Sequence, residues 1–121
     1  MQDDAAIEAL AALAHQGRLA VFRLLVKTGE EGLAAGEVAR RMATPANTMS
    51  TQLAILARTG LIRSRRESRS IIYQADYDRF AALLGFLVED CCGGRLEACA
   101  PLASVVQSVS GCATRIPVGP A

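Results

Sequence analysis

Residues 44–60 have the sequence TPANTMSTQLAILARTG, which predicts the central helix of the fold. Met49, Leu53 and Leu56 recur at helical spacing and mark one apolar face. Threonine can cap a helix and proline is tolerated at its first position, so Thr44-Pro45 predicts the start of a helix that ends at Gly60. The remaining surface of this helix carries short polar side chains, namely Asn47, Thr48, Ser50, Thr51 and Gln52.

Three further helices are expected before this one, at about residues 4–14, 18–27 and 33–43. Gly17 separates the first two, and Gly29 ends the second. The apolar residues expected to face inward are Ile7, Leu10, Leu13, Ala14, Leu19, Phe22, Leu25, Val26, Leu33, Val38 and Met42.

The periodicity changes after Gly60. Residues 61–65 and 70–74 are two short runs rich in β-branched residues, and the polar stretch 66–69 between them predicts a β-hairpin. Asp76 can cap a fifth helix that runs to about Cys92. Two helices joined by a short turn and followed by a hairpin indicate a mainly α protein with a β-hairpin wing, the winged helix-turn-helix arrangement.

The length of 121 residues fits one domain. We expect it to span residues 1–109, including a thiol site at 91–99, with a flexible tail over 110–121. The longest apolar run, Phe80 to Val88, is about half the length that a membrane-spanning helix needs. The acidic start of the chain is unlike a secretory signal, so we expect a cytoplasmic protein without a membrane partner.

The net charge of +1 conceals a strong asymmetry. Residues 40–69 contain seven arginines and one acid, giving +6, while the rest of the chain carries −5. Such a basic segment is typical of a surface that meets a polyanion, although a solvated arginine-rich face would have the same composition. The coincidence of this charge with the helix-turn-helix pattern favours DNA binding.

In that interpretation the second helix of the motif lies in the major groove of DNA. Its polar side chains, Asn47, Thr48, Ser50, Thr51 and Gln52, are candidates for contacts with base edges. Arg65, Arg66 and Arg69 on the hairpin would contact phosphates and position the protein. The alternative is that Asn47 and Thr48 only support the first helical turn while the arginines solvate a loop.

Five segments together resemble the ArsR/SmtB family of metalloregulatory repressors. They are LAHQGRL at 13–19, EVA at 37–39, NTMSTQLAIL at 47–56, GLI at 60–62 and the hairpin at 65–73. The resemblance implies a homodimer formed through the first and fifth helices, which binds operator DNA when ligand-free and leaves it when an inducer binds. The apolar stripe of the fifth helix independently favours a partner surface.

The cysteines indicate where an inducer would bind. The arsenic site on the helix before the recognition helix is absent, because residues 33–37 contain no thiol. The expected fifth helix has no histidine, and His15 lies at a helix junction where a structural role is expected. What remains is CCGGRLEAC, residues 91–99, with Cys112 further along.

Cys91 and Cys92 are too close for an unstrained disulfide, since adjacent Cα atoms lie about 3.8 Å apart. A soft ion can bridge such thiolates, and the Gly-Gly loop lets Cys99 join as a third ligand. Three thiolates suit trivalent arsenic or antimony as the inducer. This arrangement is similar to the C-terminal site of an arsenic-responsive branch of the family. A methylated arsenical, which needs only two sulfurs, stays open.

The sequence therefore predicts an arsenite- or antimonite-responsive repressor with metal ligands Cys91, Cys92 and Cys99 and no organic cofactor. A thiol redox or persulfide sensor of the same fold, with Cys99 or Cys112 bridging to Cys91 or Cys92, is the alternative. A thiol enzyme such as an arsenate reductase is disfavoured, because the stretch after Cys92 lacks a phosphatase-like anion loop.

Overall fold

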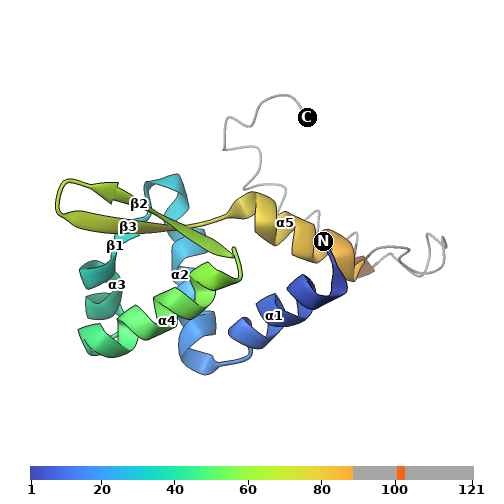
Figure 1. The fold of residues 1–121 in the computed structure, drawn as a ribbon, viewed down its shortest axis with the longest axis horizontal. Coiled ribbons are helices and arrows are strands. Elements are labelled where there is room, and N and C mark those ends of the chain that lie inside the picture. Colours follow the sequence, from blue (N-terminus) through green and yellow to red (C-terminus); the bar gives the residue numbers. More distant parts are fainter. Residues whose placement is uncertain (89–100, 103–121) are drawn as a thin grey trace. The chain divides into compact units, whose positions relative to one another are not determined.

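Five α-helices and three short strands follow one another along residues 3–87 (Figure 1). In this computed structural model, residues 1–88 and 101–102 are described, and Met1–Leu87 forms a unit separate from Val88–Ala121. The expected domain end at 109 and the tail over 110–121 lie outside the described residues. The elements are α1 (Asp3–Leu13), α2 (Gln16–Thr28), the 3-10 turn η1 (Gly29–Glu31), β1 (Leu33–Ala34), α3 (Ala35–Arg41), α4 (Ala46–Arg58), β2 (Ile62–Glu67), β3 (Ser70–Ala75) and α5 (Tyr77–Leu87).

The apolar face of α4 lies at the centre of the core. Leu53 and Leu56 are fully buried and Met49 nearly so, as the spacing predicts. Burial of each such side chain is worth about 1.5–3 kcal/mol. The same core cluster includes residues from α1, α2, α3, the hairpin and α5, so α4 is held by the whole unit.

The first helix packs differently from the expectation. Its buried residues are Ala6, Ala9 and Ala12. Ile7 and Leu10, expected to face inward, are 63% and 40% exposed, and Leu19 on α2 is exposed as well. The small alanines let the backbone of α1 approach its neighbours closely, which turns the larger side chains outward.

The expected third helix begins later than the sequence suggests. Leu33 and Ala34 form β1, which pairs antiparallel with Tyr73 and Ile72 of β3. A glycine precedes this strand because Gly32 has φ +69° and a Cβ there would overlap the Tyr73 carbonyl oxygen. The hairpin is therefore the larger part of a three-stranded sheet, in the order β1-β3-β2.

The start of α4 also differs from the expectation. Pro45 occupies the N-cap position, and no side chain caps the helix. The Thr44 hydroxyl instead donates to the Met42 carbonyl oxygen at 3.0 Å, so it stabilises the turn between α3 and α4. In this turn Ala43 adopts φ +51°, a left-handed conformation that L-residues rarely use.

The hairpin is confirmed, with longer strands than expected. β2 and β3 pair from Ile62–Ala75 at the base to Glu67–Ser70 at the tip. Only Ser68 and Arg69 remain in the connection, where Ser68 has φ +58°. The wing therefore extends away from the helices as a two-stranded ribbon (Figure 1).

The cap predicted for the fifth helix is present. The Asp76 carboxylate accepts from the Arg79 backbone N–H at 3.0 Å. Phe80 packs edge-on against Phe22 of α2, with ring centroids 5.0 Å apart. The expected end of this helix near Cys92 lies outside the described residues.

Among the described helices, none alone is both long and apolar enough to cross a membrane. Two consecutive helical segments, Asp3–Leu13 and Gln16–Glu31, would together be long and apolar enough, but the chain bends by 101° at the break between them.

The cap of α5 gives a test of local stability. Replacing Asp76 by Ala leaves the Arg79 N–H without its partner and should lower the free energy of unfolding by about 0.5–2 kcal/mol. Asp78→Ala, an exposed first-turn position of the same helix, should cost less in the same urea titration. Equal losses for the two variants would show that the cap contributes nothing specific.

Candidate nucleic-acid interface

The outer surface of α4 presents the polar side chains expected to meet DNA. Asn47, Thr48, Ser50 and Thr51 are all exposed. Asn47 Oδ1 accepts from the Thr48 N–H at 2.9 Å, and the Thr51 hydroxyl donates to the Asn47 carbonyl oxygen at 3.2 Å. These bonds support the first turn, yet within the described residues the Asn47 amide nitrogen and the Thr48 and Ser50 hydroxyls donate to no partner, and all three side chains are exposed. The structural and base-contacting interpretations are therefore compatible.

Gln52 differs from the other candidates on α4. It is partly buried, and its side-chain oxygen accepts from Arg18 Nη1 at 3.0 Å. The structure thus brings four of the five α4 candidates to open surface and holds the fifth on the flank of the helix, beside α2.

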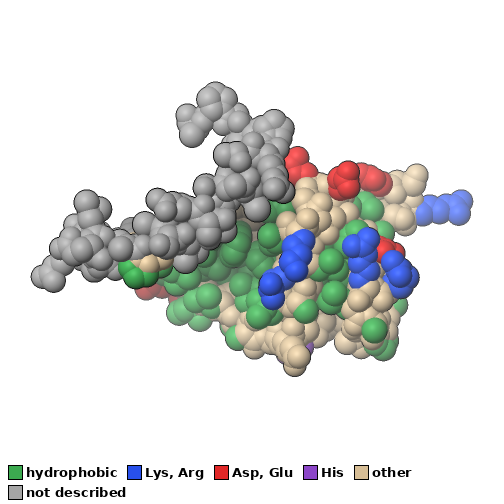
Figure 2. Space-filling model, turned by 180° about the vertical axis from the view of Figure 1, so that it is seen from behind, with side chains coloured by type: hydrophobic (Ala, Val, Ile, Leu, Met, Phe, Trp, Pro, Cys, Tyr) green, Lys and Arg blue, Asp and Glu red, His purple; other side chains and the backbone are tan. Residues whose placement is uncertain are grey.

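The three candidate arginines of the wing differ in their exposure and in their hydrogen bonds. Arg66 and Arg69 are exposed near the turn, as expected for phosphate contacts. A cationic side chain projects from the wing at the right edge of Figure 2. These two arginines, unlike Arg65, have no hydrogen-bond partner within the described part of the chain.

Arg65 is bound within the protein. Its guanidinium donates to Glu67 Oε2 at 2.7 Å, to the Gln74 side-chain oxygen, and to the carbonyl oxygens of Glu30 and Glu31 at 3.2 and 2.7 Å. These contacts join β2 to η1 and to Gln74 of β3, and so hold the wing in position. Arg65 is therefore an anchor of the wing, whereas the sequence groups it with Arg66 and Arg69 as a phosphate contact.

Two further arginines of the basic segment are also paired. Arg40 and Arg41 at the end of α3 both donate to the Glu37 carboxylate. The hydrogen bonds from Arg40 and then Arg41 lower the pKa of Glu37 from 4.5 to about 2. Glu37 therefore stays ionised in mildly acidic solution and neutralises part of the positive charge on α3.

The only histidine has the structural role expected of it. His15 caps α2, because its Nδ1 accepts from the N–H groups of Gly17 at 3.1 Å and Arg18 at 3.3 Å. An imidazole nitrogen can accept in this way only while it carries no proton, so the proton of the neutral ring is on Nε2.

The candidate thiol ligands Cys91, Cys92 and Cys99 lie outside the described residues, as does Cys112. Within residues 1–88 and 101–102 no group of three or more His, Cys, Asp or Glu side chains could hold a metal ion.

Comparison with known proteins agrees with this geometry. Residues 13–65 match the helix-turn-helix domain family. None of the curated proteins is significantly similar to the chain.

Several solved structures are similar over most of the chain. NolR from Sinorhizobium fredii is 30% identical, over 71% of this chain and 83% of that one, with a TM-score of 0.57. Mb0332 from Mycobacterium bovis, a homodimeric winged helix-turn-helix DNA-binding domain described as a possible ArsR-family regulator, is 26% identical, over 74% and 89%, with a TM-score of 0.58. An ArsR-like regulator from Rhodococcus sp. RHA1 is 21% identical and shares the fold over 86% and 92%, with a TM-score of 0.65.

The fold and these matches define a DNA-binding protein with a winged helix-turn-helix, not an enzyme. Residues 13–65 form a helix-turn-helix domain, and the structural neighbours of the chain include regulators of the ArsR family.

Sequence reasoning missed Arg18, and it assigned Arg65 to phosphate contacts rather than to bonds within the protein. Arg18 holds Gln52, and Arg65 holds the wing, and both act through partners more than 30 residues away along the chain. No local pattern signals such contacts. The spacing of apolar residues shows which side of a helix is buried, but not which long side chain reaches across to another element.

The different roles of Arg65 and Arg66 can be distinguished by experiment. Arg66→Gln should weaken binding to specific and random duplexes by similar factors and reduce the slope of log K against log salt by about 0.9 for each phosphate that the protein no longer neutralises. Arg65→Gln should instead lower the free energy of unfolding by roughly 1–2 kcal/mol, because it removes charged hydrogen bonds. Fluorescence anisotropy across a salt series and thermal melts measure both effects. An unchanged salt slope for Arg66→Gln would remove that residue from the interface.

Proposed function

We propose that the protein is a repressor of the ArsR family that responds to trivalent arsenic or antimony. In this proposal a dimer binds double-stranded operator DNA through α4 and the wing, and leaves it when the ion binds Cys91, Cys92 and Cys99. The observation that carries the proposal is the sequence CCGGRLEAC at 91–99, directly after the α5 region of a fold whose neighbours include ArsR-family regulators.

The chemistry of the cysteines supports a soft ion. Thiolates select soft ions, and three of them without a histidine suit a trivalent ion that keeps a lone pair. The single histidine is occupied as the cap of α2, at Nδ1. The chain therefore offers no histidine-rich donor set of the kind that nickel sites and histidine-type zinc sites use.

The described surface supports a dimer through α1 and α5. Ile7 and Leu10 on α1 are exposed, as are Leu84 and Leu87 on α5, and the two helices pack against each other. Hydrophobic side chains are visible on the left of Figure 2, on the side of residues 1–87 that holds these helices. Apolar surface of this kind on a small protein marks an interaction site.

A dimer also suits the DNA-binding geometry of this fold. Helix-turn-helix dimers place their two recognition helices in successive major grooves, about 34–36 Å apart. Binding of an ion after α5 would then act by favouring a dimer geometry that fits the operator less well, with a coupling of about 1–3 kcal/mol.

The dimer surface can be tested at Leu87. Leu87→Glu places a charge among the exposed apolar side chains and should give a monomer with greatly weakened operator binding. Ala82→Glu, at an exposed position on another side of α5, is the matched control and should stay dimeric. Sedimentation velocity measures the assembly state. A Leu87→Glu protein that remains a dimer would place the interface elsewhere.

The inducer site can be tested at the cysteines. Cys91→Ser and Cys92→Ser should keep operator affinity within about twofold of wild type and lose release by arsenite, since serine lacks the soft thiolate. Cys99→Ser should lose release by arsenite but can retain release by a methylated arsenical. Anisotropy of the protein–DNA complex, titrated with arsenite, zinc and an oxidant in parallel, measures release.

Intact mass identifies the chemistry of that release. Addition of an arsenic atom supports the proposal. Loss of two hydrogens under oxidant, with no response to arsenite, would establish the redox sensor instead. Wild-type release in all three serine variants would exclude the 91–99 site.

A further inference from the structure

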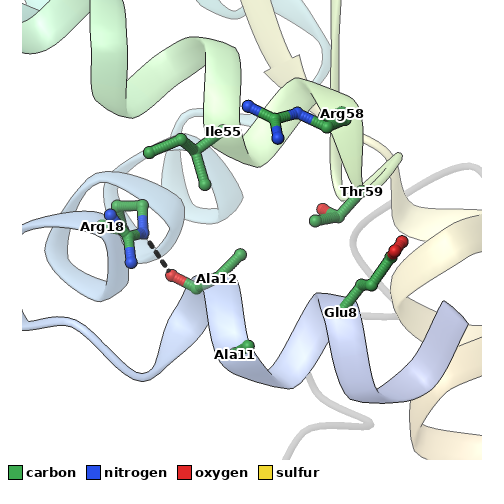
Figure 3. Close-up of a pocket in the computed structure, with 7 residues that line it drawn as sticks. All are labelled: Glu8, Ala11, Ala12, Arg18, Ile55, Arg58 and Thr59. Atoms are coloured by element: carbon green, nitrogen blue, oxygen red, sulfur yellow. Dashed lines mark hydrogen bonds between the residues drawn. The ribbon is translucent and has the colours of Figure 1, made fainter. Parts of the chain in front are cut away.

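Arg18 joins the end of α1 to the DNA-facing helix α4. Its Nε donates to the Ala12 carbonyl oxygen at 2.7 Å, and its Nη1 donates to Gln52 Oε1 at 3.0 Å. Figure 3 shows the Arg18 side chain directed at Ala12 in the last turn of α1, with Ile55 of α4 close by. The guanidinium is partly buried, so these bonds compete less with water than those of a surface arginine.

This contact fixes the orientation of the Gln52 amide. A guanidinium has donors only, so only the oxygen of Gln52 can face it. The amide nitrogen of Gln52, with its two donors, must therefore point away from Arg18.

The amide nitrogen lies beside an open groove on the flank of α4. A Cβ built on Gly17 would be 3.6 Å from Gln52 Nε2, so this nitrogen lies next to the first turn of α2. The groove has a volume of about 430 Å³, and Gln52 lines it together with Thr44 and Met49. Exposed Thr48 lies one turn earlier on the same flank of α4.

The orientation determines which bases Gln52 can contact. A free glutamine pairs with adenine through two bonds, because it accepts from N6 and donates to N7. With its oxygen directed at Arg18, Gln52 presents donors alone. Guanine, which has the acceptors N7 and O6 side by side in the major groove, is then the better partner.

We propose that Arg18 is a positioning residue that determines DNA specificity, because it holds Gln52 as a hydrogen-bond donor that selects guanine over adenine. The proposal rests on the use of α4 as the helix that contacts bases. A merely structural Arg18 would affect stability and affinity for all duplexes alike, whereas this role changes the preferred base at one position of each half-site.

Selection of duplexes from a randomised library tests the proposal. Wild type should enrich guanine over adenine at one position of each half-site by about 5- to 100-fold. Arg18→Met retains the stem but has no donors, so it should shift that position towards adenine, while Gln52→Ala should lose the preference there. Arg58→Met is the matched control, since Arg58 lines the pocket beside Arg18 but does not bond Gln52, and the selected sequence should stay unchanged.

A second variant keeps the proposal testable if Arg18→Met fails to fold. Gln52→Glu retains an acceptor for Arg18 and should melt no lower than wild type, yet its carboxylate offers no donor. It should lose guanine at the same position and favour cytosine, whose N4 is a donor.

Each contrary outcome has a distinct meaning. An unchanged sequence for Arg18→Met or for Gln52→Glu would overturn the role of Arg18. An unchanged sequence for Gln52→Ala would show that Gln52 contacts no base and would overturn it too. If wild type selected no sequence at all, the base-contacting role of α4 would fall together with this inference, while arsenite binding at the cysteines would remain a separate result.

Discussion

The apolar face of α4 lies in one core cluster with residues of every other α-helix of residues 1–87 and of the hairpin, so its burial determines how these elements are arranged. Because Met49, Leu53 and Leu56 are fixed in the core, the helix cannot rotate, and its polar surface must face outward. The same packing sets the position of the turn before α4 and of the wing after it. A surface suited to a major groove therefore follows from apolar contacts on the opposite side of one helix.

The arginines of the basic segment fall into two groups, those bound within the protein and those with no such partner in its described part. Seven arginines lie within residues 40–69, but three of them are bound within the protein, Arg40 and Arg41 by Glu37 and Arg65 by the wing and η1. These three arginines stabilise the local structure, and their positive charge is partly neutralised by the acidic side chains that they bind. The cations left to meet a polyanion are fewer than the composition suggests, and two of them, Arg66 and Arg69, lie near the tip of the wing.

The architecture could be predicted from the sequence where a feature depends on residues that are close together in the chain. The α4 stripe, the hairpin, the Asp76 cap and the structural role of His15 could all be predicted, because each depends on neighbours in the chain. The sequence could not show that alanines would form the buried face of α1, since this depends on how closely its partners approach. Nor could it show β1, whose two residues become a strand only by pairing with β3.

The candidate site was predicted only in part for the same reason. The exposed polar residues of α4 follow from helical geometry, but the partners of Gln52 and Arg65 come from distant segments. Chemistry that depends on residue type, such as the thiols at 91–99, is visible in the sequence alone and is independent of the described fold.

The exposed apolar side chains of α1 and α5 have a consequence for how such a regulator responds to its own abundance. If two copies must associate before either binds the operator, the active species grows with the square of the concentration when the protein is scarce. Association also stabilises the folded chain by mass action. For the repressor proposed above, operator occupancy would then rise more steeply than synthesis, and a cell would change from an unrepressed to a repressed state over a narrow range of copy number.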